Sequence, residues 1–365
     1  MAKLGEVCLL KAGKFVSAND ISPEYIKGLY PCFGGNGIRG YVADYTHDGE
    51  FPLIGRQGAL CGNVNLAFGK FHATEHAVVV QPKIEMNVHW LYYALNAMNL
   101  GQYATGAAQP GLAVSKLETL SIEIPNISEQ NKIAQTLYKV EQLVNFRKQQ
   151  LAKLDELVKA RFVEMFGTFP ANPFRWSIGK IQDVVSDVRY GSSRPAVEGG
   201  KYPYLRMNNI TYSGELDLRD TKRIDIPDSE LDKCTVRRGD VLFNRTNSKE
   251  LVGKTCVYNR DELMVLAGFV IRVRINERIR PEVLSAFLNM DFSKRMLIGM
   301  CKTAIGQANI NAKELQNIDL YIPPIELQDQ FVTLKNKIDQ QKQTVQQSLE
   351  KLELLKKALM QEYFG

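Results

Sequence analysis

Arginine, asparagine, threonine and lysine gather on two glycine-containing parts of the chain, residues 34–58 and 194–254. All four side chains form hydrogen bonds, and the planar fork of arginine matches phosphates and guanine edges in paired hydrogen bonds. Glycine lets the backbone between such residues approach a ligand closely. The chemistry expected here is contact with bases and phosphates. The candidate residues are Arg39, Arg56, Gln57, Arg194, Arg206, Asn208, Asn209, Arg245, Thr246, Asn247 and Lys254.

Two plainer interpretations compete with this one. A single asparagine or serine between glycines is at least as often a residue that closes a turn. The net charge of +6 is mild and uneven, with 24 Lys+Arg against 19 Asp+Glu in residues 168–325 and 9 against 10 in residues 1–125. An excess of this size is often only a solvated surface, so charge contributes little and the argument depends on the organisation of the chain.

Short strands joined by glycine turns are expected to carry these residues. In the first half they are predicted at 30–31, 34–42, 48–50 and 53–58, with Arg39 and Arg56 in the turns. In the second half, residues 202–210 and 239–254 are the counterpart. Segments 3–7 and 180–184 resemble each other weakly, and beyond them the two halves diverge almost completely.

A gapless internal repeat organises the chain. Residues 105–167 align with residues 303–365 at a constant offset of 198, and about 19 of the 63 pairs are identical. Among these pairs are Gln109 with Gln307 and Gln130 with Gln328. Chance would supply only a handful, so the protein is a duplication.

Each copy of the repeat ends in a long helical pattern. Ser128 is placed to cap the first helix, whose apolar residues then recur in steps of three and four. The first seam is interrupted by Arg147, and the second contains Lys335, Lys342 and Lys356. Each helix could simply pack on its own domain. However, about 38 helical residues span about 57 Å, more than the diameter of a domain of about 125 residues, which favours pairing of the helices with each other.

The order of the chain then predicts an assembly. If the helices pack antiparallel, the two domains lie at opposite ends of a pseudo-twofold ring. Gly365 is the repeat partner of Gly167, which leads directly into the second domain. The C-terminus is therefore expected close to Met1.

The chain resembles the specificity subunits of type I restriction-modification systems. The resemblance is carried by residues 239–254, the loop 34–58, the segment 307–311, the Ile-Pro turns before each helix and the duplication itself. It covers essentially the whole chain. The interior of the first domain is looser, and residues 109–112 depart from the second copy.

The resemblance implies an α+β fold with two mixed α/β target-recognition domains in tandem, separated by two long antiparallel coiled-coil helices. The expected division is domains at 1–125 and 168–325, with spacer helices at 126–167 and 326–365. Each domain would read half of a split double-stranded DNA target, so substitution of Arg245 should weaken recognition of one half only. The helices would set the gap and dock methyltransferase subunits, normally two, which restriction subunits then join. S-adenosylmethionine and ATP belong to those partners, so no cofactor is expected on this chain.

The segments that resemble catalytic or cofactor-binding motifs each lack a required residue. The turn at 33–37 lacks the acidic residue of a methyl-donor site, and Asn172-Pro173-Phe174 lacks the second proline of an amino-methyltransferase motif. Residues 253–255 resemble a phosphate-binding loop whose first glycine is replaced by Ser248. His72 and His76 have metal-ligand spacing but lie in a strand-like segment, and Asp220 with Lys222 forms no nuclease cluster. We therefore expect neither catalysis nor a metal.

Cysteine spacing and the distribution of apolar residues argue against zinc-binding, membrane and secreted proteins. The six cysteines have no metal-ligand spacing, no window approaches about 18 uninterrupted apolar residues, and no secretion signal is evident. We expect a reduced, cytoplasmic protein without membrane contact. The alternative function is an assembly protein that does not bind DNA and dimerises through its helices.

Overall fold

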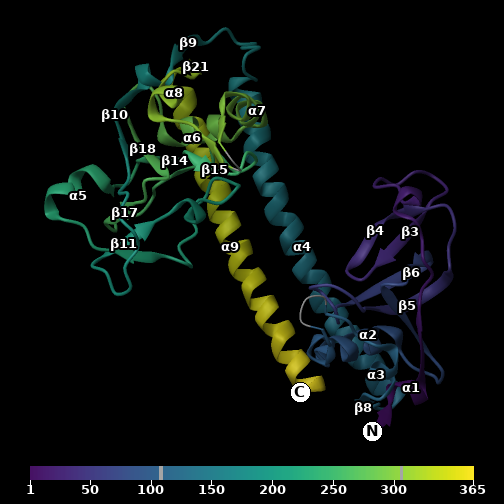
Figure 1. Ribbon diagram of the computed structural model, residues 1–365. Helices are drawn as coiled ribbons and strands as arrows, with labels where there is room; N and C mark the ends of the chain where they lie inside the picture. Colours follow the sequence, from purple (N-terminus) through teal and green to yellow (C-terminus); the bar gives the residue numbers. More distant parts are fainter. Residues whose placement is uncertain (107–109, 305–306) are drawn as a thin grey trace. The chain divides into compact units, whose positions relative to one another are not determined.

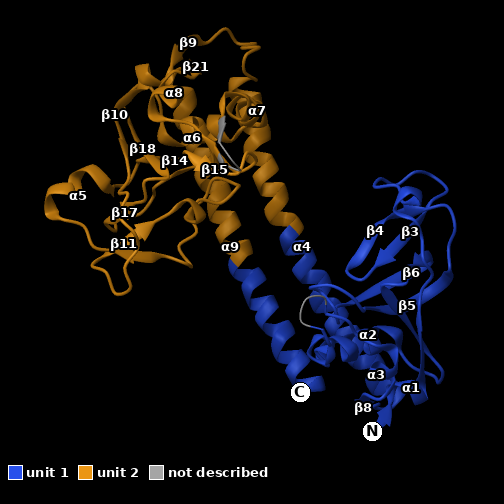
Figure 2. Ribbon diagram, in the orientation of Figure 1, with its two compact units in different colours: residues 1–148, 347–365 blue, residues 149–346 orange. Residues whose placement is uncertain are grey.

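The computed structural model describes residues 1–106, 110–304 and 307–365, so that Gln109 of the repeat lies outside the described residues (Figure 1). Two compact units are present (Figure 2): unit 1 comprises residues 1–148 and 347–365, and unit 2 comprises residues 149–346. Each long helix therefore contributes to both units. The domain and spacer boundaries expected from the sequence remain a prediction.

Unit 1 is built on a six-stranded sheet of order β2-β7-β5-β6-β3-β4, in which only β3 and β6 pair parallel. The segments 48–50 and 53–58, expected as two short strands, belong as far as Gly55 to one strand, β5, because residues 47–54 pair continuously with β6. The elements are β1 (Ala2–Lys3), α1 (Leu4–Val7), β2 (Cys8–Ala12), η1 (Ala18–Asp20), β3 (Tyr30–Gly34), β4 (Gly37–Val42), β5 (His47–Gly55), β6 (Val64–Ala73), β7 (Ala77–Pro82), α2 (Val88–Ala97), η2 (Leu100–Tyr103), α3 (Val114–Glu118) and β8 (Ser121–Ile122).

Unit 2 has shorter strands in two four-stranded sheets, β10-β18-β14-β16 and β12-β11-β17-β13, with the small sheets β15-β20-β19 and β21-β9. The elements are β9 (Ser177–Lys180), η3 (Ile181–Val184), β10 (Val185–Tyr190), β11 (Tyr202–Leu205), η4 (Met207–Asn209), β12 (Lys222–Ile224), α5 (Asp228–Cys234), β13 (Thr235–Val236), β14 (Val241–Asn244), β15 (Thr246–Asn247), β16 (Thr255–Val257), β17 (Met264–Leu266), β18 (Val270–Ile275), α6 (Pro281–Asn289), α7 (Asp291–Met300), β19 (Lys302–Ala304), β20 (Gln307–Asn309), α8 (Ala312–Gln316) and β21 (Asp319–Ile322).

The two long helices are α4 (Ile127–Phe166) and α9 (Ile325–Phe364), and both of their ends obey the repeat offset. Ser128 lies inside the first turn and does not cap it, which corrects the expectation. The cap is Asn126, whose side chain accepts a hydrogen bond from the N–H of Glu129 at 3.0 Å. The repeat partner of this position is Pro324, whose carbonyl accepts from Leu327 and Gln328.

The helices pair antiparallel, as each unit shows by itself. In unit 1, Leu137 near the start of α4 lies in the same core as Leu359 near the end of α9. In unit 2, Phe162 and Phe166 at the end of α4 meet Phe331 near the start of α9, with ring centres 5.5 and 5.4 Å apart. Both chain ends belong to unit 1, where Ala2 and Phe364 pack against one core, as expected from the repeat.

The lysines that interrupt the second seam all have carboxylate partners. Lys342 is hydrogen-bonded to Asp155 of α4 and to Glu215 of unit 2. Lys356 pairs with Glu141 at 2.7 Å within unit 1, and Lys335 pairs with Asp339 one turn further along α9. Burial alone would lower the pKa of Lys342, but its hydrogen bonds to Asp155 and Glu215 raise it instead. The seam thus tolerates these charges because acids face them.

The repeated glutamines tie each helix start to its domain. Gln130 donates to the carbonyl of Pro125 at 2.9 Å and accepts from the N–H of Asn87 at 2.9 Å. Gln328 does the same with Pro323 at 2.9 Å and with the N–H of Arg280 at 2.8 Å. Both side chains are buried. Because Asn87 and Arg280 are the N-cap residues of α2 and α6, the glutamine fixes those helices to the Ile-Pro turn.

Candidate nucleic-acid interface

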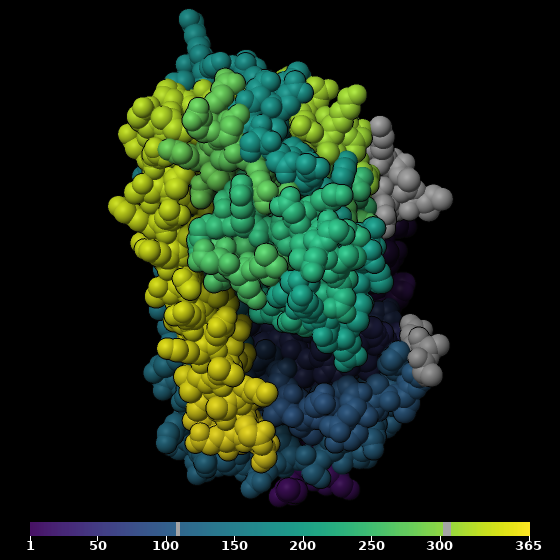
Figure 3. All heavy atoms as spheres, turned by 90° about the vertical axis from the view of Figure 1, so that its left-hand side faces the viewer, coloured from purple at the N-terminus to yellow at the C-terminus, as the bar shows by residue number. Residues whose placement is uncertain are grey.

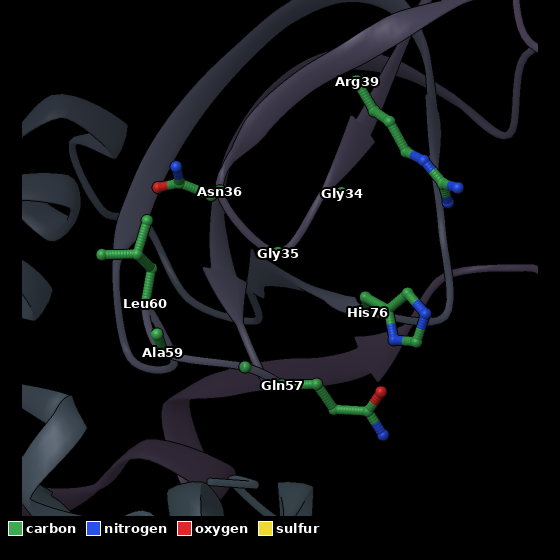
Figure 4. Close-up of a pocket in the computed structure, with 9 residues that line it drawn as sticks. Gly34, Gly35, Asn36, Arg39, Gln57, Ala59, Leu60 and His76 are labelled. Atoms are coloured by element: carbon green, nitrogen blue, oxygen red, sulfur yellow. The ribbon is translucent and has the colours of Figure 1, made fainter. Parts of the chain in front are cut away.

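A hollow of about 480 Å³ lies in unit 1 between the β3–β4 hairpin and the loop after β5 (Figure 4). We call it the unit 1 hollow. In Figure 4 the side chains of Arg39, His76 and Gln57 lie along one side of it, opposite Asn36 and Leu60. The lining residues are Gly34, Gly35, Asn36, Arg39, Gln57, Gly58, Ala59, Leu60 and His76. Two of the predicted contact residues are therefore brought together.

Two glycines allow this geometry. A Cβ atom on Gly55 would lie 1.8 Å from the carbonyl oxygen of Gly35, closer than any side chain permits. The hairpin turn therefore lies directly on the end of β5 only because Gly55 lacks a side chain, and a Cβ atom on Gly35 would crowd the carbonyl oxygen of His76 at 3.3 Å. Arg39 lies within strand β4 and not in a turn, which corrects the expectation, while Arg56 and Gln57 follow β5 directly.

The donors of the unit 1 hollow are available to a ligand. Arg39 and Gln57 are exposed, and their side chains make no hydrogen bond or ion pair among the residues that the structure describes. Arg56 is only partly exposed, and its Nε is buried without a partner within the same described set. The sequence did not indicate His76 as a neighbour of Arg39, because at least 16 residues separate His76 from every other segment that lines the hollow.

In unit 2, Arg245, Thr246 and Asn247 form a connected group on β15 and the residue before it. The guanidinium of Arg245 lies over the ring of Tyr190 at 4.8 Å and donates to Oδ1 of Asn309 at 3.1 Å. Asn309 in turn donates to the hydroxyl of Thr246 at 2.9 Å. The Tyr190 hydroxyl accepts from the N–H of Ala312 at 2.8 Å, which fixes the ring. Tyr190 is a participant that the sequence did not single out.

Arg194 and Arg206 are engaged within unit 2. Arg194 pairs with Glu230 at 2.7 Å, and this hydrogen bond lowers the pKa of the Glu230 carboxyl. Arg206 donates to the side chain of Asp220 at 2.9 Å and to its carbonyl at 3.1 Å. Both guanidinium groups would have to share or release these acids to contact a ligand. Asn208, by contrast, is exposed on η4.

Two predicted contact residues are interior residues. Asn209 is 2% exposed, and its amide accepts from the N–H of Arg206 and donates to the carbonyls of Asp217 and Asp220. Lys254 is 8% exposed and donates to the carbonyls of Met207 and Ile210, and burial lowers the pKa of its ammonium. These side chains hold the η4 loop, which corrects the expectation that they present donors outward.

Within the described residues there is no group of three or more His, Cys, Asp or Glu side chains placed to hold a metal. His72 lies in β6 and His76 in the following turn, so the strand-like interpretation of this segment is confirmed. In the same described part, no helix combines the length and the apolar character needed to cross a membrane.

Comparison with known proteins gives one family. The sequence profile described as "Type I restriction modification DNA specificity domain" matches residues 1–156 and 175–354. The specificity subunit of the type I restriction enzyme EcoprrI of Escherichia coli is 53% identical over 143 residues, covering 39% of this chain and 36% of the relative. The EcoKI specificity subunit of Escherichia coli strain K12 is 22% identical over 316 residues, covering 81% and 64%.

The fold is shared with a solved structure. The S subunit of a type I restriction-modification system from M. genitalium superposes with a TM-score of 0.64 at 18% identity, covering 100% of this chain and 95% of that one. At this identity the likeness concerns the fold. The matches to the two relatives from Escherichia coli span about one third and just under two thirds of those proteins.

Proposed function

Since the chain belongs to the type I restriction modification DNA specificity family, we propose that it reads a split double-stranded DNA target, with one half-site for each domain. The chain itself performs no catalysis. It docks methyltransferase subunits, normally two, and restriction subunits join that core. S-adenosylmethionine and ATP act on those partners, in the cytoplasm. The observation that carries the proposal is the match of one DNA specificity profile to both halves of a duplicated chain.

The exposed donors of the unit 1 hollow support base contact. Guanine presents two acceptors in the major groove that an arginine fork matches, and a glutamine amide matches adenine in the same way. Arg39 and Gln57 have the chemistry for both contacts and lie at one hollow. In unit 2 the corresponding donors are those of Asn208 and Asn247.

The long helices support a spacer and docking role. Large apolar side chains remain exposed on them, among them Tyr138 and Phe146 of α4 and Leu354 and Leu355 of α9. Figure 3 shows an outer face of α9, in yellow, at the surface. Exposed apolar groups of this size on a helix are typical of a protein interface. They favour docking of a partner chain along the helix pair.

The test is to sequence methylated DNA from cells that carry this chain together with its methyltransferase partner. We expect a two-part methylated motif that disappears when the chain is deleted. A single-part motif, or methylation that persists without the chain, would refute the proposal. The alternative, an assembly protein that does not bind DNA, is distinguished by measuring binding affinity at several salt concentrations. Phosphate contacts weaken steeply as the salt concentration rises, whereas an apolar interface does not.

The spacer role has its own test. Four residues inserted after Arg147 lengthen α4 by about 6 Å, and a matched insertion after Val345, the repeat partner of Arg147, keeps the pairing of the helices. Since base pairs rise by about 3.4 Å, the gap between the half-sites should grow by about two base pairs. An unchanged gap between the half-sites in the variant with both insertions would refute the spacer role of the helices.

One half-site per domain is tested by Gln57→Ala. The expected result is a relaxed base requirement in one half of the methylated motif, with the other half unchanged. The matched control is Gln102→Ala, which removes an exposed glutamine on η2, outside the lining of the unit 1 hollow, and should leave the motif unaltered. Loss of specificity in both halves would contradict separate readers.

A further inference from the structure

Arg56 and Arg245 occupy the same place in the two domains. The N–H of Arg56 donates to the carbonyl of His76 at 3.0 Å, and its carbonyl accepts from the N–H of Leu112 at 2.9 Å. Arg245 makes the same two bonds, to Phe269 at 3.0 Å and from Ile310 at 2.9 Å. Leu112 and Ile310 are also repeat partners at the offset of 198. The two arginines are therefore structural equivalents.

The residue before each arginine strengthens this equivalence. Gly55 ends β5, and its N–H and carbonyl bond Asn63 at 2.8 Å and Gly62 at 2.7 Å. Asn244 ends β14 and bonds Lys254 and Gly253 in the same pattern, both at 2.8 Å. The position is thus set by the same strand end and the same returning loop in both domains.

The surroundings of the two arginines have diverged. Gln57 follows the first arginine and Thr246 the second. The backbone partner of Gln57 is Gly111, and the partner of Thr246 is Asn309. The arginine is therefore the residue kept where its neighbours have changed.

The two arginine side chains also share a buried Nε atom. Arg56 and Arg245 are partly exposed, and the Nε atom of each is buried without a hydrogen-bond partner in the described part of the chain. A sunken stem holds the end of the guanidinium at a fixed height above the loop. Such a group has a short reach and a defined position.

Resting on the proposed function, we propose that Arg56 and Arg245 are twin phosphate-contacting residues that position each domain on the DNA without reading its sequence. Two domains that read different bases share one ligand feature, the sugar-phosphate backbone. A side chain that is the same in both domains is expected to contact this common backbone, whereas side chains that differ between the domains are expected to contact the bases. Base reading then belongs to changed positions such as Gln57.

The experiment measures DNA binding by the full chain assembled with its methyltransferase partner. The probes are a duplex that contains the methylated motif and a scrambled duplex, each titrated at several salt concentrations. For Arg245→Ala we expect about tenfold weaker binding to both duplexes, since a charged hydrogen bond is lost. The slope of log affinity against log salt should become less steep by about 1. Arg245→Lys should keep the slope, because a phosphate accepts any cation.

A second readout separates phosphate contact from base reading. The methylated motif should be unchanged in cells carrying Arg245→Ala or Arg56→Ala, although methylation is less complete. Gln57→Ala is the matched comparison, which should change the motif and keep the salt slope. Where an alanine variant of one arginine folds poorly, the other arginine and the lysine variants supply the same measurements.

Two results would overturn the inference. One is a changed base requirement in the motif of either alanine variant, which would make the arginine a base reader. The other is an unchanged affinity and salt slope, which would make it a purely structural residue. Neither result affects the proposed function, which fails only when the unaltered chain directs no two-part motif.

Discussion

Replacing Lys342 with methionine tests how the paired helices tolerate a lysine in their seam. The Lys342 side chain is 11% exposed, and its two carboxylate partners, Asp155 and Glu215, are 38% and 44% exposed. Methionine keeps most of the length and the apolar stem of lysine but removes the ammonium. The variant therefore isolates the charge from the packing.

The expected loss in the free energy of unfolding is moderate. Removing one partner of a fully buried ion pair costs about 3–5 kcal/mol, but carboxylates that are more than a third exposed regain water, which reduces the cost to about 1–2 kcal/mol. For a unit of this size each kcal/mol lowers the thermal midpoint by about 2–4 °C. We expect the unfolding transition of unit 2 to fall by about 2–8 °C in differential scanning calorimetry.

Two controls make this result interpretable. Lys337→Met removes an exposed lysine of the same helix within unit 2 and should change the midpoint by less than about 2 °C. The triple variant Lys342→Met, Asp155→Asn, Glu215→Gln removes all three charges together and should recover most of the loss.

The stabilising effect of Lys342 depends on pH. Because the pKa of Lys342 is raised in the folded chain, its stabilising effect is present below its ordinary value of 10.5 and is lost only as the pH passes the raised value. If Lys342→Met were as stable as the unaltered chain at pH 7, the ion pairs would contribute nothing, and the account of the seam would be refuted.

Three further predictions concern unit 2. Gln328→Ala should destabilise it by about 1–3 kcal/mol, because the partly buried N–H of Arg280 loses its acceptor; a thermal midpoint within about 1 °C of the unaltered chain would contradict this. Gly191→Ala should cost about 1–3 kcal/mol, because a Cβ would lie 2.3 Å from the carbonyl oxygen of Leu266, whereas Gly299→Ala in α7 meets nothing within 4 Å and serves as the matched control in denaturant unfolding. Burial lowers the pKa of Lys294 to about 7, so the folded chain resists its protonation, and Lys294→Met should be more stable than the unaltered chain at pH 7. That advantage should shrink as the pH rises from about 7 toward 10.5, and a constant difference would contradict the burial argument.

The repeat was readable in the sequence because it contains no gap. Both long helices begin and end at repeat partners, Ile127 with Ile325 and Phe166 with Phe364. Helical periodicity is a local property, so spacing along the chain was enough to predict two helices and their apolar seams. Pairing of the helices was expected from their length, and the antiparallel direction from the resemblance to the family. The cap was missed because Asn126 and Ser128 are both good cap residues, and only the backbone distinguishes them.

The similarity between the two domains cannot be detected by aligning their sequences at a constant offset. The separation between equivalent positions changes along the chain: Arg56 and Arg245 differ by 189 residues, and Leu112 and Ile310 by 198. Loops of different length separate the same strands, so no constant offset aligns them. Backbone hydrogen bonds keep the pattern because they do not depend on the side chains.

The candidate contact residues show where sequence reasoning ends. Residue type and loop composition found Arg39 and Gln57, whose side chains are exposed, together with Asn209 and Lys254, whose side chains are buried. A donor can serve a ligand or its own loop, and composition does not separate the two uses. The choice is made by which carbonyls and carboxylates the fold brings within 3 Å, as Met207 and Ile210 are brought to Lys254. That proximity joins residues more than 40 positions apart, so only the tertiary structure decides it.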